Sequence, residues 1–100
     1  PDLPHYITEN GIAAADDIRQ GNLQDLDRID YFNSHLERIA DLKAQGVHLA
    51  GYFAWSLLDN YEWAFGYAKR FGIVHVDFST QKRTPKSSYL AWQNALANRP

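Results

Sequence analysis

The chain has 100 residues, a formal net charge of −2 and a hydrophobic content of 45%, which allow one small domain with a packed core and argue against intrinsic disorder. Its Lys and Arg residues are scattered and it contains no long apolar run, so neither a nucleic-acid-binding surface nor a membrane span is expected. The lack of Cys excludes disulfides and thiolate metal sites, and it is compatible with the cytoplasmic location that we expect.

The first predicted element is a short strand over residues 4–8, which runs into Glu9-Asn10-Gly11, a sequence typical of a turn. Residues 12–24 show no regular spacing of apolar side chains, so we expect a surface loop there.

Residues 25–45 carry the clearest helical pattern. Apolar side chains recur at steps of three and four, which places them in one stripe along a helix: Leu26, Ile29, Phe32, Leu36, Ile39 and Leu42. Asp25 and Asp27 favour the N-terminal end of this helix, and Lys43 favours its C-terminal end. Gly46 suits the left-handed conformation in which many helices end.

The next strand is predicted over residues 47–54, which are apolar at nearly every position. A strand that is apolar on both faces is typical of a parallel sheet covered by helices. Residues 55–70 are aromatic and irregular, so we expect a long loop with a helical turn. Residues 71–78 form another predicted strand, which we place outside the main sheet.

A final helix is predicted to begin at Thr84, with the Thr side chain as N-cap and Pro85 in the first helical position. Its expected buried side consists of Tyr89, Leu90, Trp92 and Leu96. The order of strand, helix, strand, loop and helix is typical of a parallel α/β protein.

Glu9 is the first candidate for chemistry. It follows a predicted strand, and in α/β barrels the groups at the carboxyl ends of strands point into the active site. A carboxylate there could act as nucleophile, base or metal ligand. Position alone favours the alternative of a loop glutamate in solvent.

Three residues that follow the second strand are suited to binding a sugar. The indoles of Trp55 and Trp63 offer flat apolar faces and an N–H donor. Glu62 can accept hydrogen bonds from neighbouring hydroxyls. Taken alone, the three residues favour the alternative that both Trp side chains pack in a core and Glu62 lies on the surface.

The other polar residues indicate no second site. The four His residues are far apart and none has a partner at metal-ligand spacing, so we assign structural roles to His5, His35, His48 and His75. Asp59-Asn60 is expected to brace the loop and Lys69-Arg70 to be solvated. The sequence contains neither a Gly-rich phosphate loop nor a Gly-x-Ser-x-Gly elbow.

Literal strings in the sequence indicate a family. Residues 6–11, YITENG, resemble the I/V-T-E-N-G motif of glycoside hydrolase family 1, and residues 51–63, GYFAWSLLDNYEW, resemble the segment with which that family binds the glycone. The strings KRFGI at 69–73 and RTPKSS at 83–88 are similar to the regions that follow in the family. The resemblance spans essentially the whole chain.

The resemblance implies an α/β fold, since the family forms a (β/α)8 TIM barrel. Residues 1–100 would be its C-terminal quarter, with strand 7, helix 7, strand 8 and helix 8. Such a barrel typically needs about 250 residues, and the family's acid/base motif, Asn-Glu-Pro, does not occur in the chain. We therefore expect a piece of a longer protein, whose partner is the N-terminal part of the barrel.

The resemblance also implies roles for five residues. Glu9 would be the nucleophile that attacks the anomeric carbon. Trp55 would form the platform beneath the glycone, and Phe71 would line the pocket near O6. Glu62 would accept hydrogen bonds from the O4 and O6 hydroxyls, and Trp63 would donate one from its indole.

The implied activity is that of a retaining β-glucosidase, which releases terminal β-D-glucosyl residues from a β-glucoside or a short β-linked oligosaccharide. Neither a metal nor an organic cofactor is required. Family members that act on 6-phosphorylated sugars have Ser in place of Glu62, so we expect an unphosphorylated glycone: glucose first, with galactose or fucose as alternatives. A non-catalytic fragment that binds sugar weakly is the alternative from another class of function.

Overall fold

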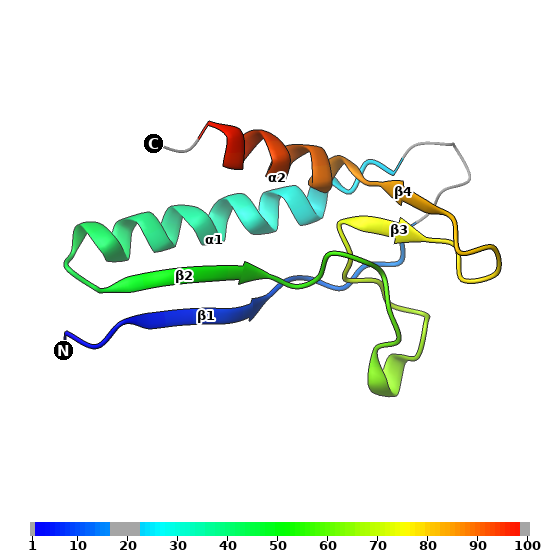
Figure 1. Cartoon of the computed structure of the whole chain (residues 1–100), viewed down its shortest axis with the longest axis horizontal. Helices are drawn as coiled ribbons and strands as arrows, with labels where there is room; N and C mark the ends of the chain where they lie inside the picture. Colours follow the sequence, from blue (N-terminus) through cyan, green and yellow to red (C-terminus); the bar gives the residue numbers. More distant parts are fainter. Residues whose placement is uncertain (1, 17–22, 99–100) are drawn as a thin grey trace.

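The computed structural model describes residues 2–16 and 23–98, with elements in the predicted order (Figure 1). They are β1 His5–Asn10, α1 Leu26–Ala44, β2 Leu49–Ala54, a 3-10 helix Trp63–Phe65, β3 Val74–Val76, β4 Arg83–Pro85 and α2 Ser87–Ala97. None of the helices in these two ranges is long and apolar enough to cross a membrane.

β1 and β2 form a two-stranded parallel sheet, and α1 connects them. His5 pairs with Leu49 and Asn10 with Ala54, so the carboxyl ends of both strands meet at the same edge. Both helices lie on one side of this sheet (Figure 1). The strand–helix–strand unit confirms the predicted parallel α/β class.

β1 is longer than predicted. The sequence indicates a strand that ends at Thr8, whereas Glu9 and Asn10 also belong to β1. The extension follows from pairing with the neighbouring strand, because Asn10 lies opposite Ala54 and its carbonyl accepts a hydrogen bond from the Trp55 N–H at 2.8 Å. Glu9 is therefore part of the sheet and not of a turn.

The helix predicted over residues 25–45 is confirmed as α1. Its apolar stripe is buried to different degrees, since Phe32 is 3% exposed and Leu26 is 60% exposed. The helix ends as predicted: Gly46 has a φ of +94°, and its N–H donates to the Lys43 carbonyl at 3.0 Å.

β2 begins at Leu49, two residues later than predicted, and it is not buried on both faces. Tyr52 and Ala54 pack against the core, whereas Phe53 is 57% exposed. The helices cover only one side of the sheet, so the other side is open in the described part of the chain.

The strand predicted over residues 71–78 is shortened to β3. It pairs antiparallel with β4 in a second sheet, which confirms that it lies outside the β1–β2 sheet.

The predicted start of the final helix is wrong. Thr84 and Pro85 belong to β4, and α2 begins only at Ser87. The N-terminal turn is capped from elsewhere, because the Asp25 carboxylate accepts hydrogen bonds from the Ser88 N–H at 2.9 Å and the Ser88 hydroxyl at 2.5 Å. Pairing with β3 and this distant cap outweigh the local capping signal of Thr84-Pro85.

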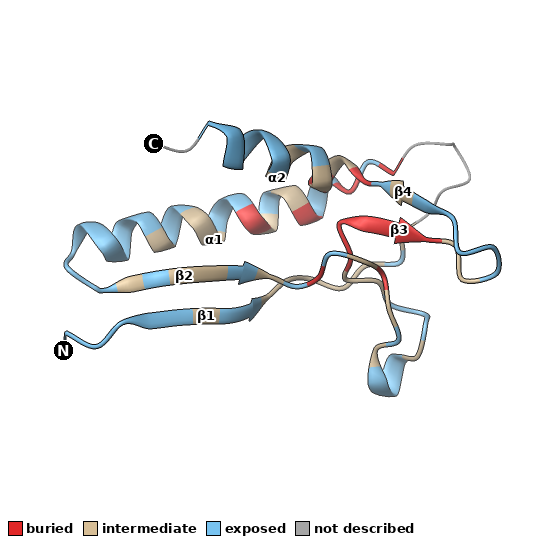
Figure 2. Cartoon of the chain, viewed as in Figure 1, coloured by how far each residue is buried: buried red, intermediate tan, exposed pale blue. Residues whose placement is uncertain are grey.

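The core is small and lies where β3 meets the two helices (Figure 2). The Trp92 ring contacts Phe32 edge-on at 5.4 Å and stacks on Tyr52 at 5.9 Å between centroids. Tyr89 and Trp92 pack on this core as predicted, whereas Leu90 and Leu96 are more than half exposed.

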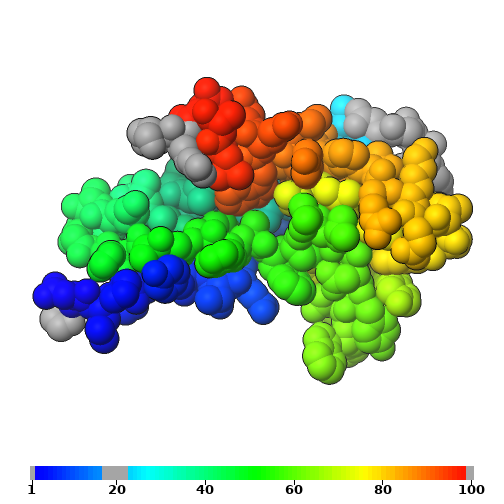
Figure 3. All heavy atoms as spheres, viewed as in Figure 1, coloured from blue at the N-terminus to red at the C-terminus, as the bar shows by residue number. Residues whose placement is uncertain are grey.

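The molecule is thin for its length. It measures 47 × 30 × 19 Å and has a radius of gyration of 15.1 Å, whereas a compact domain of this size has about 13 Å. Figure 3 shows the segment around Glu62 and Trp63, drawn in green, projecting from the body of the molecule.

Candidate active site

Two of the five predicted site residues lie at the carboxyl ends of the paired strands. Glu9 is the next-to-last residue of β1, and Trp55 directly follows β2. The two ends touch through the hydrogen bond from the Trp55 N–H to the Asn10 carbonyl. Gly11 permits this contact, because a Cβ there would overlap the Trp55 carbonyl oxygen. The close approach therefore explains the glycine of the string YITENG.

The Asn10 side chain fixes the end of β1 against the helical layer. The Tyr52 hydroxyl donates to Asn10 Oδ1 at 2.5 Å, and Asn10 Nδ2 donates to the Tyr31 hydroxyl at 3.2 Å. Burial, with a smaller effect of Tyr31, raises the pKa of Tyr52 to about 12, so its hydroxyl stays protonated at neutral pH. Glu9 directly precedes Asn10, in a stretch where the pairing register with β2 is irregular, and it is exposed.

Glu62 and Trp63 lie on a loop that leaves the body after Asp59 and returns at Gly72, which we call the excursion (residues 60–71). The Glu62 N–H donates to the Gly66 carbonyl at 2.7 Å, which closes a tight turn at its tip. Glu62 is half-buried, Trp63 is 83% exposed and Trp55 is 37% exposed. Among the described residues, neither Trp is buried in a core.

Phe71 lies beside the segment that follows Trp55. The Ser56 N–H donates to the Phe71 carbonyl at 3.1 Å, and the Ile73 N–H donates to the Ser56 carbonyl at 3.0 Å. The structure thus brings the regions of Glu9, Trp55 and Phe71 together and places the remaining two residues at the tip of the excursion. In the part of the chain that the structure describes, no hydrogen bond joins two of the five side chains.

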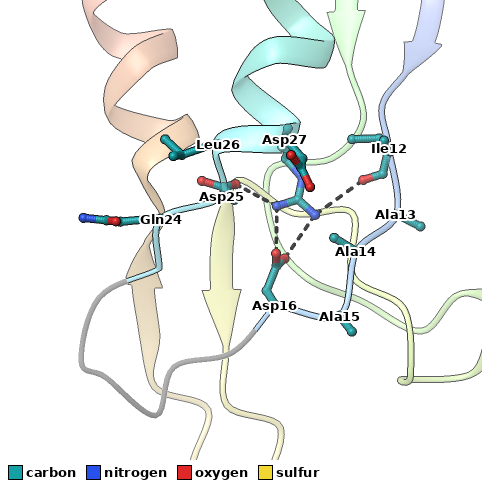
Figure 4. Close-up of a pocket in the computed structure, with 10 residues that line it drawn as sticks. Ile12, Ala13, Ala14, Ala15, Asp16, Gln24, Asp25, Leu26 and Asp27 are labelled. Carbon is teal, nitrogen blue, oxygen red and sulfur yellow. Dashed lines mark hydrogen bonds and ion pairs between the residues drawn. The ribbon is translucent and has the colours of Figure 1, made fainter.

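Six charged side chains form a buried ion network that the sequence did not predict: Asp16, Asp25, Arg28, Asp59, Arg70 and Lys86. Its three positive and three negative charges balance. The Arg28 guanidinium, in a residue only 1% exposed, donates to Asp25 at 2.7 Å, to Asp16 at 3.2 Å and to the Arg70 carbonyl at 2.8 Å. Figure 4 shows Asp16, Asp25 and Ile12 arranged around this group.

Lys86 and Asp59 form the centre of the ion network. Lys86 is fully buried, and Nζ donates to Asp16 at 2.5 Å, to Asp59 at 2.8 Å and to the Gly72 carbonyl at 2.6 Å. Asp59 also accepts from Arg70 at 2.6 Å. Burial alone would raise the pKa of Asp59, but the hydrogen bonds from Lys86 and Arg70 outweigh it and hold the pKa below its usual range.

Three predictions for polar residues can be compared with these contacts. Asp59 and Asn60 brace the loop as predicted, since Asn60 Nδ2 donates to Ser56 Oγ at 3.1 Å. The prediction that Arg70 is solvated is wrong, because it binds Asp59 and lies 4.6 Å from the centre of the Phe78 ring. Within residues 2–16 and 23–98, no group of three His, Asp or Glu side chains is arranged to hold a metal ion.

The comparisons with known proteins define the class. A family model described as glycosyl hydrolase family 1 matches residues 1–99, and the chain therefore belongs to this family, whose members are TIM barrels. β-Glucosidase A of Thermotoga maritima is 54% identical over 95 residues, which are 93% of this chain and 21% of that protein. A 6-phospho-β-galactosidase of Clostridium acetobutylicum is 51% identical over 83 residues, which are 83% of this chain and 18% of that protein.

Solved structures agree with this assignment. A β-glucosidase from Exiguobacterium marinum matches with a TM-score of 0.94 and 49% identity, over 98% of this chain and 22% of that chain. A β-glucosidase from Thermotoga maritima in complex with glucoimidazole matches with a TM-score of 0.92 and 51% identity, over 95% of this chain and 22% of that chain. The chain thus spans about a fifth of the length of these relatives, and the family resemblance is confirmed.

Proposed function

We propose that the chain functions as part of a retaining β-glucosidase in which Glu9 is the nucleophile. The observation that carries the proposal is the position of Glu9 at the carboxyl end of a parallel strand, in contact with the strand end that bears Trp55. This edge is the catalytic end of a (β/α)8 barrel. In that barrel, β1, α1, β2 and α2 would be strand 7, helix 7, strand 8 and helix 8.

The mechanism that this position supports is a double displacement. A Glu9 carboxylate oxygen attacks the anomeric carbon while the bond to the leaving oxygen breaks, and a second carboxyl group protonates that oxygen. Water then attacks the anomeric carbon of the glycosyl ester and gives a proton to the second carboxylate. The bond between the anomeric carbon and Glu9 breaks, and the Glu9 carboxylate is restored. The two carboxyl groups should lie about 5–5.5 Å apart, with the second supplied by another part of the barrel.

The glycone would be bound by the other four predicted residues. Trp55 provides a partly exposed ring beneath the sugar, and Phe71 lines the O6 end. Glu62 accepts from O4 and O6, and the exposed indole of Trp63 donates a hydrogen bond. The half-buried position of Glu62 and the 83% exposure of Trp63 are compatible with these roles.

The glycone should be unphosphorylated. High identity to both a β-glucosidase and a 6-phospho-β-galactosidase shows that overall similarity does not decide this point. The Glu62 carboxylate supports an unphosphorylated glycone, because it would repel a phosphate at O6, and like charges brought together disfavour the wrong ligand. Aryl glucosides with and without the 6-phosphate test the proposal, and preference for the phosphorylated substrate would contradict it.

The test of Glu9 uses a complete barrel. This barrel is a hybrid, in which the present chain replaces the matching segment of Thermotoga maritima β-glucosidase A; we call it the hybrid barrel. We expect it to hydrolyse an aryl β-glucoside and to be labelled on Glu9 by a 2-deoxy-2-fluoro glucoside, as read by mass spectrometry of the labelled peptide. Glu9→Gln should abolish labelling and lower kcat at least about a thousandfold, the scale found for loss of a catalytic group.

Glu37→Gln is the matched control, because Glu37 is exposed on α1 and should leave labelling and kcat unchanged. A label on any other residue would refute the assignment of Glu9. A hybrid barrel that folds but neither hydrolyses nor becomes labelled would favour the alternative of a fragment that binds sugar weakly, through exposed rings such as that of Trp63.

A further inference from the structure

The excursion that carries Glu62 is fixed at its base by Asp59. Asp59 Oδ1 accepts a hydrogen bond from the Gly72 N–H at 3.0 Å, and the Asp59 N–H donates to the Val74 carbonyl at 3.1 Å. The two ends of the excursion touch directly, because a Cβ on Gly72 would lie 2.7 Å from Asp59 Oδ1 and overlap the neighbouring backbone. The base therefore has little freedom to move relative to the ion network.

A series of ring contacts runs from this base toward the tip. Arg70, which is bound at the base, lies 4.6 Å from the centre of the Phe78 ring. The Phe78 ring packs on Tyr67 with centroids 4.4 Å apart, and Tyr67 meets Tyr61 edge-on at 5.3 Å. Tyr61 directly precedes Glu62 in the chain. These contacts link the ion network to the tip through side chains that the proposed mechanism does not use.

The tip itself has little else to hold it. Its 3-10 helix, Trp63–Phe65, contains no buried residue, and a backbone pairing between Glu62 and Gly66 closes the turn without tying it to the body. Contact between aromatic rings favours defined offset or edge-on geometries, so the ring contacts can fix the height of the tip above the base. Phe78 lies outside the excursion and contacts both Arg70 and Tyr67.

We propose that Phe78 is a positioning residue for Glu62. Its ring holds the Tyr67–Tyr61 pair and thereby sets where the Glu62 carboxylate meets the sugar hydroxyls. Phe78 touches no substrate and acts only through the excursion. The inference rests on the proposed glycone role of Glu62 and adds a determinant of glycone selectivity that lies outside the sugar pocket.

The test compares two substrates in the hybrid barrel: an aryl β-glucoside and the matching aryl β-xyloside, which lacks C6 and its hydroxyl. The ratio of their kcat/KM values does not depend on the fraction of folded enzyme, so a purely structural defect leaves it unchanged. Phe78→Leu should lower this ratio about tenfold, the scale of a lost hydrogen bond to a charged group. Phe78→Tyr keeps the ring and should keep the ratio, as should Lys82→Ala, an exposed residue in the same β3–β4 connection.

Two further variants keep the test decisive. Tyr67→Leu removes the same contact from the excursion side at a residue that is 56% exposed, so it serves if Phe78→Leu does not fold. In a Glu62→Gln background, Phe78→Leu should cause no further fall, because residues that act through one contact are not additive. If Glu62→Gln lowers the ratio and neither leucine variant does, the positioning role is refuted. If Glu62→Gln itself leaves the ratio unchanged, the glycone role of Glu62 fails, and the inference fails with it.

Discussion

On its own, the 100-residue chain should not behave as a compact monomer that melts cooperatively. Its accessible surface is 7223 Å², whereas a compact monomer of 11.5 kDa exposes roughly 5,800 Å². The difference is about 1,400 Å². Large apolar side chains contribute to the exposed surface: Tyr6, Leu26, Phe53, Leu57 and Leu90.

This excess can be converted into a free energy. With about 60% of the excess apolar and about 25 cal/mol per Å² of apolar area, its burial would contribute about 20 kcal/mol. The net stability of a whole domain is only about 5–15 kcal/mol. A chain that leaves this surface in water therefore has no margin of stability. A two-stranded sheet whose outer edges are unpaired within residues 2–16 and 23–98 adds a tendency to associate.

The assay is sedimentation velocity of the isolated chain, followed by a urea titration monitored by near-UV circular dichroism of its three Trp residues. We expect an expanded or self-associated species, a weak near-UV signal and no sharp transition. The hybrid barrel is the control, because the same segment should give a strong near-UV signal there. A monomer of 11.5 kDa with one sharp urea transition would refute the reasoning.

Three further predictions concern the hybrid barrel. Lys86→Met should lower the free energy of unfolding in urea by about 3–5 kcal/mol, because it leaves buried carboxylates uncompensated, whereas Lys82→Met on the surface should change it by less than about 0.5 kcal/mol. Gly11→Ala should separate the two strand ends and lower kcat/KM, because a Cβ there would overlap the Trp55 carbonyl oxygen. Gly46→Ala is the control, since Gly46 has open space around it. It should lower the free energy of unfolding by only about 1 kcal/mol, because of its positive φ, and leave kcat/KM unchanged. Burial, aided by the charge of Arg70, lowers the pKa of His75, so the folded state keeps it neutral. Its contribution is present above the unfolded-state pKa of about 6.5 and is lost as the pH falls below it, so His75→Gln should flatten the decline in urea midpoint on acidification from pH 7.

The elements that the sequence predicts correctly are those specified by local periodicity. α1 follows from apolar spacing alone, and its end follows from Gly46. The errors occur where a distant partner decides. β1 extends through Glu9 because β2 pairs with it, and α2 starts late because Asp25, 63 residues before Ser88, caps it. Such partners leave no trace in a local pattern.

The candidate site shows the same division. Their positions after predicted strands indicated Glu9 and Trp55 as candidates. Position alone favoured a solvent-exposed loop residue for Glu9 and core packing for Trp55, so the family strings were needed to favour chemistry. Of the ion network, Asp25 and Arg28 stand three residues apart and could have been recognised as a helical pair. Lys86 meets Asp16 across 70 residues, and neither residue has a neighbour in sequence that indicates the contact.

The ion network also indicates why the two segments that carry the site hold a defined geometry. Apolar side chains of similar volume would often stabilise a fold as well as a buried ion pair does, but apolar packing does not fix direction. Here the segment after β1 and the return of the excursion exchange two backbone hydrogen bonds between Ala14 and Arg70, at 2.9 and 2.8 Å. Arg28 and Lys86 then bind both segments through directed contacts. The proposed nucleophile and the proposed glycone loop are therefore held by one charge-balanced framework. A change in the ion network should accordingly disturb catalysis and glycone binding together, whereas a change at Phe78 should disturb glycone selectivity alone.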